Sequence, residues 1–149
     1  MQNEPQIEIL NDLILINNDR IEGYKKAAEN LKDNNSELLS LFGSLERESR
    51  HNVEELTQHI IGMGGEPTTG TTTGGKIYRA WMDVKATFGG DDAKGVLESC
   101  ESGEDAAKRA YDSAMKSGEL TDVCVPLVSR QQEAQLRGHD KIRALRDRM

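Results

Sequence analysis

Residues 6–32, QIEILNDLILINNDRIEGYKKAAENLK, decide the fold. Apolar side chains recur in this stretch at intervals of three, four or seven residues, which places them along one face of an α-helix. They are Ile7, Leu10, Ile14, Ile21, Tyr24, Ala28 and Leu31. A long helix with a single apolar stripe is typical of helical bundles, in which each helix buries one face against its neighbours.

The same periodicity predicts three further long helices, at about residues 37–63, 91–117 and 122–148. We expect Ser36 to cap the second helix and Asp122 to cap the fourth, because both side chains can accept hydrogen bonds from backbone N–H groups. The links within each pair of helices are short, so each pair is expected to form an antiparallel hairpin.

A link of about 25 residues separates the two predicted hairpins. Its first part, GEPTTGTTTGG at 65–75, contains no apolar side chain and predicts a linker. Its second part, residues 76–88, predicts a short amphipathic helix whose apolar stripe includes Trp81 and packs across the bundle. A long crossover between two hairpins is typical of ferritin-like bundles. The predicted fold is therefore an all-α, single-domain, ferritin-like four-helix bundle over residues 1–149.

Four segments, in their order and spacing, resemble an uncharacterised bacterial family of ferritin-like four-helix-bundle proteins. They are LNDLILINNDRIEGYKKAAE (10–29), YRAWMDVKATF (78–88), CESGEDAAKRAY (100–111) and GHDKIRALRD (138–147). The resemblance implies the bundle fold, a bacterial cytoplasmic setting and stress-related expression. It implies no reaction, because that family has no established one.

Ferritin-like bundles that hold two metal ions use two inward Glu residues and two Glu-x-x-His motifs. Glu48 and His51 match that motif by spacing, but His51 is expected to point to solvent and to pair with Glu48 on the surface. Of the required carboxylates, only Glu104 faces inward on its helix. One alternative remains: a single iron, manganese or zinc ion held by Glu104 and His139, with Glu48 or His59.

The inward polar positions are instead dominated by amides. We expect Asn17, Asn52, Glu104, Gln131 and Gln135 to form a buried hydrogen-bond network with no metal ion or other cofactor. In such a network, replacement of Glu104 by Gln should leave stability unchanged or raise it. No nucleophile–base constellation is visible, so a structural or partner-binding protein is expected rather than an enzyme.

Composition narrows the possible partners. The net charge of −7, from 26 acidic and 19 basic residues, argues against nucleic-acid binding. No apolar run approaches the roughly 20 residues that span a bilayer, so no membrane role is expected. Two cysteines without a metal-finger spacing and a polar start, MQNEPQ, indicate a cytoplasmic protein with reduced thiols. Self-association into a homo-oligomer is expected.

Overall fold

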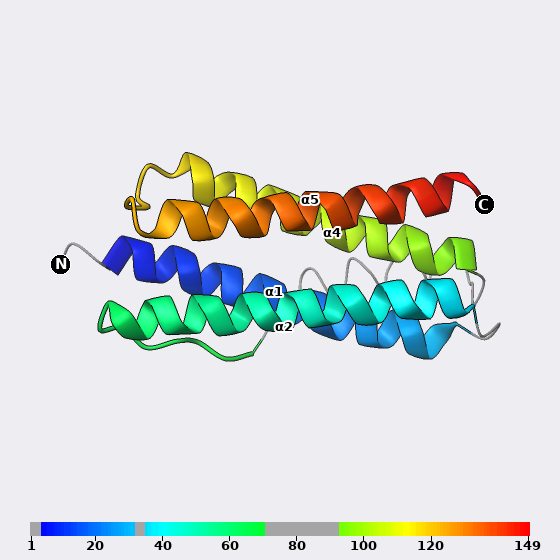
Figure 1. Ribbon diagram of the computed structural model, residues 1–149, viewed down its shortest axis with the longest axis horizontal. Coiled ribbons are helices and arrows are strands. Elements are labelled where there is room, and N and C mark those ends of the chain that lie inside the picture. Colours follow the sequence, from blue (N-terminus) through cyan, green and yellow to red (C-terminus); the bar gives the residue numbers. More distant parts are fainter. Residues whose placement is uncertain (1–3, 32–34, 71–92) are drawn as a thin grey trace.

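The computed structural model describes residues 4–31, 35–70 and 93–149. These ranges contain four α-helices and no strand: α1 (Glu4–Asn30), α2 (Ser36–Gly62), α4 (Ala93–Lys116) and α5 (Cys124–Asp147). The helices pack lengthwise into an elongated bundle (Figure 1). The prediction of an all-α four-helix bundle is confirmed, and the described helix ends lie within two residues of those expected.

The helices form two hairpins, α1 with α2 and α4 with α5, which contact each other chiefly through α1 and α4. In Figure 1, α2 ends at the end of the bundle where α5 begins, whereas α4 begins at the opposite end. Residues 63–70, at the start of the link, turn back along α1. There the Asn11 and Asn18 side chains donate hydrogen bonds to the carbonyls of Glu66 (3.1 Å) and Gly70 (2.6 Å). The helix predicted at 76–88 lies outside the described residues.

Both predicted helix caps are wrong. Asn35, rather than Ser36, caps α2, and its side-chain oxygen accepts a hydrogen bond from the Leu38 N–H at 3.1 Å. Ser36 is already the first helical residue. Asp122 does not cap α5 either: the helix begins two residues later without a side-chain cap. The Thr121 carbonyl instead accepts from the backbone N–H groups of residues 124 and 125, at 3.0 and 2.9 Å.

Glycines follow the ends of α2 and α4, as expected from their positions in the sequence. Gly64 has φ of +80° and Gly118 has φ of +73°. This left-handed conformation is strained for residues with a Cβ atom, so glycine lets the chain leave a helix at these two points.

The interior is apolar towards both ends of the bundle and polar between them. Leucine, isoleucine, valine, alanine, tyrosine and phenylalanine side chains from all four helices form the apolar core. Near the midpoint of each helix, polar side chains replace them. These are Asn17, Arg20, Ser49, Asn52, Glu104, Gln131 and Gln135, each at most 4 % exposed. None of the described helices is long and apolar enough to cross a membrane.

Candidate functional site

An ion pair with no exposed surface lies at the centre of the bundle. The Arg20 guanidinium on α1 donates two parallel hydrogen bonds to the Glu104 carboxylate on α4, from Nε to Oε1 and from Nη2 to Oε2, each 2.9 Å long. Both side chains are 0 % exposed. This bidentate geometry is the strongest arrangement available to an arginine and a carboxylate, and it fixes α1 against α4.

Side chains from all four helices complete this charged cluster, which we define as Arg20, Tyr24, Glu48, Ser49, Glu104 and Gln135. The Tyr24 hydroxyl donates to Glu104 Oε2. Gln135 Nε2 on α5 donates to Glu104 Oε1 at 3.2 Å and to the Glu104 carbonyl at 2.9 Å. On the other side, Arg20 Nη1 donates to Ser49 Oγ (2.9 Å) and Glu48 Oε2 (3.2 Å), both on α2. The guanidinium therefore lies between two carboxylates.

A neutral amide cluster, defined as Asn17, Asn52, Tyr111 and Gln131, lies beside it and also draws on all four helices. Asn17 Nδ2 donates to the Tyr111 hydroxyl (2.8 Å), which donates in turn to Gln131 Oε1 (2.9 Å). Asn52 Nδ2 donates to Asn17 Oδ1 (3.1 Å), and Gln131 Nε2 donates to the Asn52 carbonyl (3.3 Å). Amides suit such a chain because each both donates and accepts.

Burial and neighbouring charges shift the pKa values of Arg20, Tyr24 and two groups near the charged cluster, Cys100 and Tyr111. Burial alone would lower the pKa of Arg20, but Glu104, Tyr24 and Glu48 outweigh it and raise that pKa above its usual value. Burial and the Glu104 carboxylate raise the pKa of Tyr24 and of Cys100. Burial likewise raises the pKa of Tyr111 to about 12. At neutral pH, Arg20 is thus charged and the nearby hydroxyls and thiol are neutral, which leaves no activated nucleophile among these groups.

The five residues predicted to form one network are all buried, but they divide between the two clusters. Asn17, Asn52 and Gln131 belong to the amide cluster, while Glu104 and Gln135 belong to the charged cluster. Arg20 was not identified as an inner residue from the sequence, although its spacing from two neighbouring inner residues indicates this position. It lies three residues after Asn17 and four before Tyr24, both assigned to the inner face, and residues at those spacings share a helix face.

The four residues of the alternative metal site do not form one group, because only Glu48 and Glu104 meet and each histidine has another partner. Glu48 and Glu104 both bind Arg20. His139 Nε2 lies 2.6 Å from Asp105 Oδ1, and its Nδ1 lies 3.2 Å from Asp140 Oδ1. His59 Nδ1 faces the backbone carbonyl four residues before it, at 3.2 Å. In residues 4–31, 35–70 and 93–149, no group of three or more His, Cys, Asp or Glu side chains could hold a metal ion.

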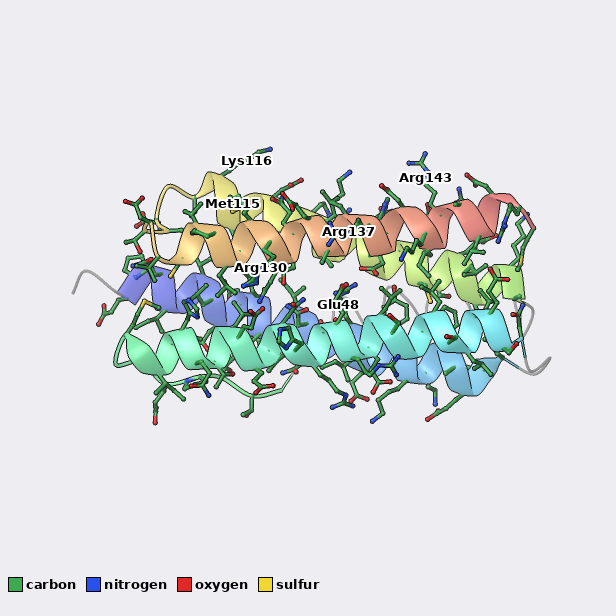
Figure 2. The ribbon with its side chains drawn as sticks, viewed as in Figure 1. Glu48, Met115, Lys116, Arg130, Arg137 and Arg143 are labelled. Carbon is green, nitrogen blue, oxygen red and sulfur yellow. The ribbon has the colours of Figure 1, made fainter. Side chains whose placement is uncertain are left out.

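Glu48 and His51, which match the Glu-x-x-His spacing, have different partners in the structure. His51 is 69 % exposed, as its helix phase predicts, but its Nε2 lies 3.8 Å from Glu55 Oε1. The expected surface pair with Glu48 was wrong, because the Glu48 carboxylate turns inward to Arg20. In Figure 2, Glu48 rises from α2 into the space that faces α5.

A family described as "Domain of unknown function (DUF2383)" matches residues 6–117. The chain belongs to this family. The match includes α2, α4 and all but the first two residues of α1, and hence the Arg20–Glu104 pair. Helix α5, with Gln131 and Gln135, follows the match. The expectation of an uncharacterised family is confirmed, and membership brings no reaction with it. No curated protein matches the chain.

Proposed function

We propose that this chain is a structural or partner-binding helical bundle whose interior is held together by a built-in organic cation instead of a metal ion. The observation that carries the proposal is the position of the Arg20 guanidinium between Glu104 and Glu48. In metal-holding ferritin-like bundles, carboxylates from several helices surround the metal ions. Here the carboxylates are already neutralised by an arginine that cannot lose its proton.

This arrangement disfavours a divalent ion for a physical reason. A metal ion at the Glu104 carboxylate would lie a few ångströms from the guanidinium, and repulsion between like charges is strong in a dry interior. Displacement of Arg20 would leave its charge buried and unpaired, which costs several kcal/mol. The donors left in the interior are largely amides and hydroxyls, which stabilise the helix packing by hydrogen bonds.

The proposal also includes the ferritin-like connectivity, the cellular setting and the self-association of the bundle. Ferritin-like connectivity is supported by the opposite ends at which α2 finishes and α4 starts (Figure 1). Free, buried Cys100 and Cys124 suit a reducing bacterial cytoplasm, where a stress-related role fits the family resemblance. Partner binding through self-association is supported by exposed Ile61 and Val123, which are 54 % and 70 % exposed. Light scattering after size exclusion, on wild type and Val123→Lys, tests that step.

The decisive experiment asks whether metal ions stabilise the protein. Protein purified without an affinity tag is analysed for metals, and its thermal unfolding is followed with and without Mn²⁺, Fe²⁺ and Zn²⁺. We expect no stoichiometric metal and no shift in Tm, because a ligand that does not bind the native state leaves its stability unchanged. One or two bound ions per chain, with a rise in Tm, would reject the proposal in favour of a metal-binding bundle.

Variants at Arg20 sharpen this test. Arg20→Ala removes the cation but keeps Glu48 and Glu104, so the variant should lose stability and regain part of it with Mn²⁺. Arg20→Lys retains a positive charge and serves as the control, with no response to metal. If the wild type and Arg20→Ala respond equally to Mn²⁺, the guanidinium is not what keeps metal ions out.

A further inference from the structure

Helices α2 and α5 form the most open side of the bundle. They approach each other less closely than the other neighbouring helices do, and long charged side chains bridge them. Arg130 Nη2 lies 2.9 Å from Glu55 Oε2, and Arg148 Nη2 lies 3.5 Å from Glu37 Oε1. These two pairs show that the helices run antiparallel in a constant register: a residue further along α2 lies opposite a residue that is equally far back along α5. The same antiparallel register places Ser44 level with Lys141.

A groove of about 500 Å³ opens between the two helices at the end where α2 begins and α5 finishes. Its apolar lining comes from Leu41, Ala144 and Leu145, and both leucines pack against the core. Its polar lining includes Ser44 and Lys141, and the exposed Glu37–Arg148 pair lies at its outer end. This volume lies within the usual range of small-molecule sites, about 300–1,000 Å³.

The charge at this groove is opposite to that of the whole protein. The charged side chains in the groove lining are Lys141, Arg148 and Glu37, which leave one net positive charge in a chain with a net charge of −7. Arg146 is paired with Glu101 and Asp147, and Arg148 with Glu37. Within the part of the chain that the structure describes, Lys141 forms no ion pair. A free ammonium group therefore lies beside an apolar surface.

We propose that this groove binds a small amphipathic carboxylate, a medium-chain fatty acid in its free form. The carboxylate lies at Lys141 with the Ser44 hydroxyl, and the hydrocarbon chain lies over Leu41, Ala144 and Leu145 towards the Glu37–Arg148 pair. From Lys141 to Arg148 the groove follows seven residues of α5, about 10 Å of helix. That distance suits an extended medium-chain acid. The site is separate from the buried clusters and independent of the function proposed for them.

The test is a calorimetric titration of the whole chain with decanoate below its micelle concentration, at constant ionic strength. We expect one saturable site per chain. Decanol lacks the charge and decyltrimethylammonium reverses it, so both should bind at least about fivefold more weakly, as the loss of one partly exposed ion pair predicts. No saturable binding of decanoate, or equal binding of decanol, overturns the proposal.

Two variants locate the site, with a control on the same helix. Lys141→Gln should weaken decanoate binding about fivefold, and Ala144→Trp, at an exposed position, should fill the groove and abolish binding. Arg143→Gln is the matched control: it removes the same charge from α5, but Figure 2 shows Arg143 projecting away from α2. It should change affinity by less than about twofold. Equal losses in Lys141→Gln and Arg143→Gln would mean non-specific attraction and would also overturn the proposal.

Discussion

Replacement of Glu104 by Gln tests the role of the buried ion pair most directly. The wild-type carboxylate is fully buried and accepts hydrogen bonds from Arg20, Tyr24 and Gln135. Glutamine has the same shape, but it offers one acceptor oxygen and turns an N–H₂ group towards a guanidinium that can only donate. Arg20 then keeps only Glu48 as a counter-charge, a carboxylate that is 26 % exposed and 3.2 Å away.

The expected loss of stability is large. Removal of one partner from a buried ion pair costs about 3–5 kcal/mol, because the other charge stays buried without compensation. That is a substantial part of the roughly 5–15 kcal/mol that stabilises a typical domain. At about 2–4 °C per kcal/mol for a chain near this size, Tm should fall by roughly 10 °C. For the hydrogen-bond network expected from the sequence, Glu104→Gln should leave stability unchanged or raise it. The buried Arg20 reverses that expectation, because the variant leaves its charge without a close partner.

Urea unfolding followed by circular dichroism at 222 nm measures the change, provided that the slope of the transition is unaltered. Glu46→Gln is the control, because it breaks an exposed pair with Arg50 and should cost less than about 1 kcal/mol. The double variant Arg20→Met with Glu104→Gln should be more stable than the sum of the two single losses predicts. A Glu104→Gln protein as stable as wild type, or strictly additive losses, would refute the reasoning.

Three further outcomes follow from the amide cluster and the α2 cap. Tyr111→Phe should cost about 1–3 kcal/mol, since it leaves Gln131 Oε1 without its buried donor. Urea unfolding measures this loss, with a Glu133→Gln variant at an exposed position of α5 as the control. Because the pKa of Tyr111 is raised from 10.0 to about 12, the folded state holds this proton more tightly. The neutral Tyr111 hydroxyl therefore contributes its full stabilisation below pH 10 and loses it between pH 10 and 12. If the unfolding free energy of Tyr111→Phe falls as steeply over that range as that of the wild type, Tyr111 does not cause the pH dependence. Asn35→Ala should lower the unfolding free energy by about 1 kcal/mol, whereas Ser36→Ala should have little effect; the reverse order would restore Ser36 as the cap.

The long helices were predictable because each contains its own signal. Apolar residues repeat with the period of the helix, and turn residues such as Gly118 interrupt the pattern. These are local properties of the chain, so they can be recognised without knowing which helices pack together. Caps were less predictable, because Asn35 and Ser36 are both good capping residues and adjacent in sequence. Only the backbone angles decide which of them stands outside the helix.

The inner positions were also largely visible in the sequence, although their chemistry was not. Helix phase assigned Asn17 and Tyr24 to the inner face and therefore implied Arg20 between them. Arginine is rarely buried unless it is paired, and its partner Glu104 lies 84 residues away, beyond the reach of any local pattern.

The sequence by itself thus determined which segments are helices and which face of each is turned inward, because both follow from spacing along one chain. Only the tertiary structure decided that an arginine lies between Glu104 and Glu48, and that His139 binds Asp105 instead of sharing an ion with them. The reason is physical: a charge buried at the meeting point of several helices takes its partner from whichever helix approaches it. That choice is made in space, when the helices pack.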